Sequence, residues 1–514
     1  MNHKPRTRRE FLGQVGQGTL LATLGCGIAK ELGLTPALAE PPPEALTFGP
    51  LEPLVQLMQD TPAKNLLPLL TEKLRGGTDL KTLVTAGAYA NARTFGGQDY
   101  DGYHTVMAMG PAFHMSREMP AGQEALPIFK VLYRNTACIQ GHGGRKSEVM
   151  HAVKPAAMPA DGNRAEALQA IVRTNDMNGA EQAFAALAAT SPEEAFNDLL
   201  YAVQDHTDVH RVVLPYRSWD LLGMIGMEQA HTMLRQSLRF CVGSGTSETS
   251  TLLPKLLEEH KLMGRQPGDR KAEDAWVDKF SMTIFNGTPK EAATAVAAAL
   301  AEGISPADIG EAVALAANQL ILRDTGRTAE METNNKPLGS VHGASIGVHA
   351  CDSANAWRNM ARVSNTRNNY ACLILGAYQV AQDRVQRGGD FLHWSPLPVH
   401  RQVTEIHATD PDSLLRQAEG CIRNNQQAHA CAAIARYGEL NHDPRGAFNL
   451  LLKYAVSEDG SLHAEKFYRT CSEEFAGARS AFRWRYLIAL ARVTASEFGR
   501  PAAGVAEARQ LLKV

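Results

Sequence analysis

The sequence predicts an all-α protein, built from divergent helical-hairpin repeats packed around a central cavity. Alanine-rich stretches place apolar residues at intervals of three to four positions, which is typical of one face of a helix. Alternating runs of β-branched residues are scarce, and no glycine-rich phosphate loop follows a candidate strand. The same type of capped helix start also recurs along the chain. These three observations favour helices throughout and disfavour a nucleotide-binding α/β fold.

The N-terminus has the pattern of a twin-arginine export signal. The run TRREFL at residues 7–12 precedes an apolar, glycine-rich stretch at residues 13–29, and ALA at residues 37–39 offers a small-x-small cleavage site. The apolar stretch is shorter than the ~20 apolar residues of a membrane span. We therefore predict that residues 1–39 are a signal peptide, that the twin-arginine translocase exports the folded protein, and that it resides in the periplasm.

The exported part, residues 40–514, is long enough for a single large helical domain, with a repeat-like core at about 75–450. The whole chain has 52 Lys and Arg, 54 Asp and Glu and a net charge of −2. The signal segment is basic, so the exported part is more acidic still. Without a basic stripe, nucleic acid is not expected as a partner. No later apolar run reaches the length of a membrane span.

Of the eight cysteines, only Cys26 lies in the signal segment. The others form no C-x-x-C pair, so zinc ribbons, thioredoxin-like sites and covalently attached c-type haem lack their signatures. Most of them lie in apolar helical patterns, and we predict buried thiols.

Helices and linkers can be placed along the chain by composition. Alanine-rich helical patterns cover residues 180–189, 290–303 and 311–322. Linker-like stretches, rich in Gly, Pro, Asn and charge, lie at residues 155–163, 263–270, 323–340 and 388–398.

Four helix starts share one kind of N-cap, in which Ser, Thr or Asp can accept a hydrogen bond from a free N–H of the first turn. They are Thr78-Asp79, Ser191-Pro192, Ser305-Pro306 and Asp410-Pro411. In three of them, proline takes the first helical position, where its missing N–H costs nothing. The recurrence indicates a degenerate internal repeat.

After each capped helix, a histidine lies near the start of the next apolar segment. These histidines are His104, His210, His342 and His429. A fifth copy around His463 is less regular. The unequal spacing excludes a regular solenoid and fits a helical array with insertions, in which equivalent helices converge on a common centre. Because neutral imidazole is the commonest metal ligand, we predict a shared metal site, the alternative being local capping or packing.

Two further patterns add candidate ligands. Glu228 and His231 have the Glu-x-x-His spacing that places a carboxylate and an imidazole on one helical face. One copy favours a mononuclear site with mixed ligands, or simply a polar helix face. His349 follows His342 by seven residues and would share its helical face. The predicted metal ligands are therefore His104, His210, Glu228, His231, His342, His349 and His429.

Two arginines could act near such a site. In the glycine-rich stretch 141–148, Arg145 and His142 could bind an anionic cofactor group, although the stretch also fits a loop that ends a helix. Arg217 could lie beside a substrate or form a structural ion pair. We predict His210, Arg217 and His342 as catalytic residues and His142 and Arg145 as cofactor-binding residues.

The segment from His210 to His231, with the run VHGA at residues 341–344, resembles the helical domain of questin-oxidase-like proteins. It is also similar to bacterial helical domains associated with Rieske ferredoxins. The resemblance covers about residues 75–450, and it implies an all-α oxidoreductase with His104, His210, His231 and His342 in its site. This chain has no Rieske Cys/His motif, so an exported enzyme would need another electron source.

These observations predict an exported metal- or haem-dependent oxidoreductase that acts on a small organic substrate, with iron as the preferred metal. Two alternatives remain open. One is a non-catalytic helical scaffold that binds a partner or ligand in the cell envelope. The other is a metal-independent hydrolase or lyase that uses a histidine base. A Ser-His-Asp hydrolase is disfavoured because no Gly-x-Ser-x-Gly element is present.

Overall fold

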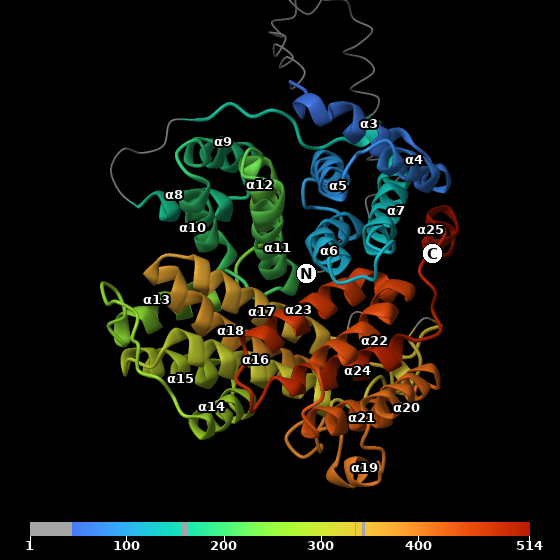
Figure 1. Ribbon diagram of the computed structural model, residues 1–514. Coiled ribbons are helices and arrows are strands. Elements are labelled where there is room, and N and C mark those ends of the chain that lie inside the picture. Colours follow the sequence, from blue (N-terminus) through green and yellow to red (C-terminus); the bar gives the residue numbers. More distant parts are fainter. Residues whose placement is uncertain (1–43, 157–162, 335, 342–344) are drawn as a thin grey trace, which may run out of the picture. The chain divides into compact units, whose positions relative to one another are not determined.

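The computed structural model describes residues 44–156, 163–334, 336–341 and 345–514, and their regular structure is helical (Figure 1). The all-α prediction is confirmed: these residues form 23 α-helices, and their only β-type pairings are isolated bridges. Residues 46–514 form one compact unit. The predicted signal segment and His342 lie outside the described residues.

The helices form four consecutive groups, each of which packs mainly within itself. The first contains α3 (Glu52–Asp60), α4 (Ala63–Arg75), α5 (Leu80–Phe95), α6 (Tyr100–Ser116) and α7 (Ala125–His142). The second contains α8 (Arg164–Arg173), α9 (Met177–Ala188), α10 (Pro192–Val203), α11 (Val209–Ile225) and α12 (Ala230–Ser244). The third contains α13 (Thr249–Glu259), α14 (Asp274–Asn286), α15 (Pro289–Ala301), α16 (Pro306–Arg323), α17 (Ile346–Val363) and α18 (Thr366–Arg387).

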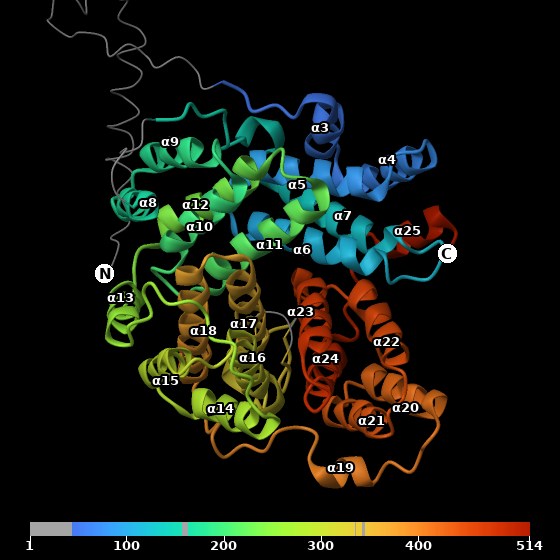
Figure 2. The same ribbon diagram turned by 60° about the vertical axis from the view of Figure 1, so that its left-hand side comes forward.

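The fourth group contains α19 (His400–Thr404), α20 (Pro411–Arg423), α21 (Gln427–Glu439), α22 (Pro444–Ser457), α23 (His463–Gly477) and α24 (Trp484–Glu497). The last helix, α25 (Val505–Leu512), returns to pack on α4 and α7. Figure 2 shows the first two groups above the third and the fourth, which lie side by side.

One helix of each group reaches the centre of this arrangement. Helix α6 packs against α11 and α23, and α17 packs against the same two helices, so the four contacts close a ring. Each central helix is the next α-helix after one that has the recurring type of N-terminus. Helices α5, α10 and α16 begin at positions predicted from the sequence, and α22 begins at Asp443-Pro444, which has the same pattern. Equivalent helices therefore converge, as the internal repeat predicts.

Three of the four predicted caps are confirmed. The side chains of Asp79, Ser191 and Asp410 each accept hydrogen bonds from backbone N–H groups of the first turn. Ser305 makes no such bond, although Pro306 still begins its helix. A side-chain cap of this kind contributes about 1 kcal/mol to stability, so the helix starts are set by local chemistry.

The structure agrees with the predicted thiols and with part of the predicted linkers. The stretches 263–270 and 388–398 fall between helices, and 323–340 begins at the last residue of α16 and contains a short 3-10 helix, η3 (Ala329–Met331). Residues 157–162 of the remaining stretch lie outside the described residues. The seven described cysteines are free thiols, and six of them are buried, with Cys138 partly exposed. Among the described residues, no helix combines the length and the apolar character that crossing a bilayer requires.

Candidate functional site

Four histidine rings meet where the central helices meet. His104 lies on α6, His210 on α11, His349 on α17 and His463 on α23. The ring centroids are 4.8 Å apart for His104 and His210, and 5.1 Å apart for His104 and His463. The centroid of His349 lies 5.7 Å from that of His210 and 5.3 Å from that of His463. We call these four residues the histidine cluster; their contacts close the same ring as their helices.

The protein orients several of these rings through their Nδ1 atoms. Nδ1 of His104 donates to the Tyr100 carbonyl at 2.7 Å, and Nδ1 of His463 donates to the Ser461 carbonyl at 3.2 Å. Since a carbonyl can only accept, both Nδ1 atoms carry the proton and both Nε2 atoms keep a lone pair. Nδ1 of His210 lies 3.5 Å from a carboxylate oxygen of Asp208, the N-cap of α11. Metal-binding histidines are commonly held in this way.

Two of the four Nε2 atoms have no hydrogen-bond partner in the described part of the chain, and the other two contact each other. Among the described residues, Nε2 of His104 and Nε2 of His210 are buried without a hydrogen-bond partner. Nε2 of His349 lies 3.2 Å from Nε2 of His463. A buried polar atom without a partner costs about 1–3 kcal/mol, so the cluster is suited to a group that accepts lone pairs.

The environment keeps three of the rings, those of His104, His349 and His463, neutral. Burial, followed by the charge of Lys466 and by repulsion from His210, lowers the pKa of His104 to about 2. Burial and the same two groups lower the pKa of His349 to about 3, and burial lowers the pKa of His463 well below its ordinary value. At neutral pH these imidazoles are unprotonated, which is the form that binds metals.

A strained turn holds His463 in place. Gly460, Ser461 and Leu462 form a short 3-10 helix, η4 (Gly460–Leu462), immediately before α23. Ser461 and Leu462 have φ angles of 51° and 64°, in the left-handed region that costs an ordinary residue roughly 1–2 kcal/mol. The turn aims the Ser461 carbonyl at His463, and such strain tends to concentrate at functional sites.

A buried lysine adjoins the cluster. Lys466 lies one turn after His463 on α23, and burial lowers its pKa to about 8 although Asp352 and Glu465 oppose this shift. Glu465 also pairs with the buried Lys130, at 2.7 Å from its Nζ atom. The positive charge near the histidines is therefore partly balanced by buried carboxylates.

Arg217 belongs to a buried network that joins three of the central helices. From α11, its guanidinium donates to the Thr470 hydroxyl at 3.1 Å and to Glu473 at 3.4 Å, both on α23. It also lies 3.5 Å from Asn355 on α17. The structural ion pair, which the sequence left as the alternative for Arg217, is therefore present, and it braces the helices that carry three cluster histidines.

Glu228 and His231 do not share a helix. Gly226, with a φ of 109°, ends α11, and Glu228 lies exposed in the turn before α12 begins at Ala230. The expected helical geometry is absent because α12 begins after Glu228, so only His231 is on the helix. The His231 ring instead packs near Phe184, at a centroid distance of 5.8 Å.

His429 is exposed in the first turn of α21, and its place in the cluster is taken by His463. A feature of the sequence indicates that His463, and not His429, belongs to the cluster. Asp443-Pro444 begins α22 with the same kind of cap, and Asp443 accepts a hydrogen bond from the backbone of Arg445. Counting this fifth cap would have assigned His463 to the central position.

His142 and Arg145 lie at the exposed end of α7. Gly143, with a φ of 114°, terminates the helix, so the stretch has the helix-ending geometry that was its alternative interpretation. Arg145 pairs with Asp60 at 3.4 Å, and the edge of the His142 ring faces Phe95 at 5.1 Å.

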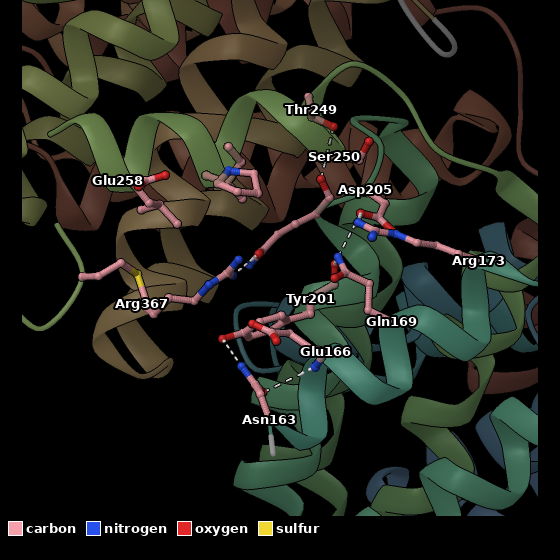
Figure 3. A pocket seen from close by; sticks show the side chains of 15 residues that line it. Asn163, Glu166, Gln169, Arg173, Tyr201, Asp205, Thr249, Ser250, Glu258 and Arg367 are labelled. Atoms are coloured by element: carbon pink, nitrogen blue, oxygen red, sulfur yellow. Dashed lines mark hydrogen bonds and ion pairs between the residues drawn. The ribbon is translucent and has the colours of Figure 1, made fainter. Parts of the chain in front are cut away.

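A pocket of about 190 Å³ adjoins the cluster, and His104, His463, Arg134 and Lys336 are among the residues that line it. A larger pocket of about 440 Å³, lined by α8, α10, α13 and α18, contains no histidine (Figure 3). Its acidic group Asp205 is already satisfied by Arg173 at 2.6 Å and by Gln169 at 2.9 Å. The histidine cluster is the better candidate for chemistry.

Among the described residues, no group of three or more His, Cys, Asp or Glu side chains is already arranged to hold a metal ion. Comparison of the chain with protein-family models, curated proteins and solved structures finds no match. Any function must therefore be inferred from the geometry and chemistry of the site itself.

Proposed function

We propose that the histidine cluster binds one transition-metal ion and that the protein is an exported oxidoreductase acting on a small organic molecule. One observation carries the proposal: four imidazoles from four helix groups meet, and the buried Nε2 atoms of two of them, His104 and His210, have no hydrogen-bond partner among the described residues. Four nitrogens in tetrahedral coordination at ~2.1 Å from a metal lie about 3.4 Å from one another. The Nε2 atoms of His349 and His463 are 3.2 Å apart.

Metal binding would require the histidine rings to rotate, because no three ligand side chains among the described residues already point at a common metal position. Rotation of side chains can bring the Nε2 atoms together while the helices stay in place. The backbone carbonyls that bind His104 and His463 would limit this rotation and select the tautomer with a free Nε2.

A single ion fits the cluster better than a haem. Rings with centroids as close as 4.8 Å leave no room for a macrocycle between them. Imidazole ligands suit iron, copper, zinc and nickel. An oxidoreductase needs a metal that changes its oxidation state, so iron is our first choice and copper our second. The predicted twin-arginine signal supports loading of the metal before export, and the resemblance to questin-oxidase-like proteins supports the same reaction class.

A second candidate is a metal-free hydrolase or lyase in which histidines move a proton. The direct contact between His349 and His463 favours it, because a neutral His349 could donate from Nε2 to the lone pair of His463. In this case the buried Lys466 would stabilise neutral rings by repelling a second proton.

Elemental analysis and a visible spectrum of protein purified from the exported pool would test the proposal. We expect about one equivalent of iron or copper in the native chain. His349→Ala and His463→Ala should abolish binding, and His231→Ala and His429→Ala, outside the cluster, should retain it. Helical circular dichroism confirms that each variant folds. Native protein without metal would favour the proton-transfer candidate or the scaffold, and metal retained by both cluster variants would exclude the cluster as the site.

A further inference from the structure

We propose that the pocket beside the histidine cluster binds a small organic carboxylate through Arg134 and Lys336. The inference deepens the proposed function and rests on it, because it assigns the class of substrate that the oxidoreductase would take.

The pocket joins the cluster to the surface. Helix α6 contributes Tyr100 and His104, α7 contributes Arg134, and the turn before α23 contributes Leu462 and leads into His463. Lys336 lines it from the linker between α16 and α17. A molecule in this pocket therefore lies against two of the four cluster rings.

Within the described part of the chain, the two cations of the pocket have no carboxylate partner, although Arg134 is hydrogen-bonded to the Cys138 thiol. Among the described residues, no carboxylate oxygen lies within 4.0 Å of the Arg134 guanidinium or the Lys336 ammonium group. Burial, followed by the like charge of Arg327, lowers the pKa of Lys336. Its own charge extends to His349 in the cluster.

One carboxylate, that of Asp101, also lines the pocket, but it is exposed in the first turn of α6. Two cations therefore face one exposed carboxylate, beside imidazoles that stay neutral. The excess positive charge favours an anionic ligand.

Shape and chemistry narrow the choice to a small carboxylate. The planar guanidinium of Arg134 matches the two oxygens of a carboxylate, and Lys336 adds a point charge. A volume of about 190 Å³ is below the roughly 300–1,000 Å³ of pockets that hold drug-sized ligands. The ring of Tyr100 and the side chain of Leu462 supply apolar surface for a short carbon skeleton. With its carboxylate on the cations, such a molecule would direct its remaining atoms toward His104 and His463.

Isothermal titration calorimetry with propionate, oxalate and inorganic phosphate tests this inference on the full exported chain, both as purified and after removal of metal. We expect saturable binding of a carboxylate at least tenfold tighter than binding of phosphate. Arg134→Gln and Lys336→Gln should each weaken it at least tenfold. Arg401→Gln is the matched control, since Arg401 is exposed on α19 and forms an ion pair with the neighbouring Glu405, away from the pocket. Circular dichroism verifies the fold of each variant.

The outcomes separate the two proposals. Carboxylate affinity that is unchanged in both pocket variants, or a preference for phosphate, would overturn the inference. Carboxylate binding that depends on Arg134 and Lys336 in a chain that never holds metal would support the pocket and reject the metal site. Metal bound in the native chain without any carboxylate binding would support the metal site and reject the pocket.

Discussion

In three histidines of the cluster, the Nδ1 atom faces an oxygen atom of the protein. His104 and His463 donate to backbone carbonyls, and His210 lies beside the Asp208 carboxylate. His231 has a similarly buried ring but packs near Phe184, away from any other histidine ring in the described part of the chain. At the scale of single residues, contact with other imidazole rings therefore separates a candidate ligand from a packing group.

His231 makes stability depend on pH. Burial, together with the charge of Arg235, lowers its pKa in the folded protein to about 4, whereas the unfolded value is about 6.5. The unfolded chain therefore takes up the proton first as the pH falls. This contribution to stability is fully present above pH ~6.5 and is lost toward pH ~4, by about 1.4 kcal/mol per pH unit. His231→Gln should flatten the decline between pH 6.5 and 5 in urea unfolding, and an unaltered slope would contradict this assignment.

Asp208 combines two roles that substitutions can separate. It caps α11 and lies beside His210, and hydrogen bonding to that histidine lowers its pKa to about 2 although burial opposes the shift. Asp208→Asn should keep the cap but remove the charge, whereas Asp208→Ala should cost about 1 kcal/mol more in urea unfolding. Both should weaken metal binding, by about 10- to 100-fold in a metal titration. Native affinity in Asp208→Asn would show that the carboxylate does not position His210.

At the scale of helices, the cluster depends on how α11, α17 and α23 are held together. The network around Arg217 joins all three, and the Tyr216 hydroxyl donates to Glu473 at 2.9 Å within it. Arg217 is buried, so its charge depends on the carboxylate across the helix interface. By holding α11, α17 and α23 together, the network fixes the relative positions of the histidines that these helices carry.

Glu473→Leu should therefore lower the free energy of unfolding substantially. It would leave the buried Arg217 without its nearest carboxylate, and breaking a buried pair costs about 3–5 kcal/mol. The double variant Arg217→Leu/Glu473→Leu should recover part of this loss in urea unfolding. Glu259→Leu, which breaks the exposed pair with Lys255, is the control and should cost less than about 1 kcal/mol. Equal costs for the buried and the exposed pair would refute the role of the network.

At the scale of the whole molecule, the histidines lie at the only place where one helix from each of the four groups meets the others in a closed ring, within the described ranges. A ligand bound there contacts all four groups at once. It would stabilise the packing of the groups against one another, in addition to any role in chemistry.

Metal removal should therefore lower the melting temperature of the whole unit. A metal at 100 times its Kd adds about 2.7 kcal/mol to the stability of the folded state. Scanning calorimetry with and without a chelator should show a lower Tm for the metal-free native chain. The His349→Ala/His463→Ala variant should have the same Tm in both conditions. If the Tm of the native chain is the same with and without the chelator, this result would argue against a metal at the cluster.

The sequence was enough to predict the helices, their starts and the existence of a histidine repeat. Helix formation depends on hydrogen bonds between residues four apart and on caps within one turn, and both are visible in a short stretch of sequence. The caps at Asp79, Ser191 and Asp410 and the alanine-rich helical patterns were therefore predictable. His104 and His210 were likewise placed correctly at the starts of central helices.

Only the tertiary structure decided which histidines meet. His463 rather than the exposed His429 completes the cluster, and His349 contributes from α17. Glu228 lies in the turn between the end of α11 and the start of α12, so it does not share the helix of His231. These outcomes depend on the rotation of each helix about its axis and on contacts between residues more than 100 positions apart. Local sequence patterns do not specify such contacts, because packing across the whole core determines them.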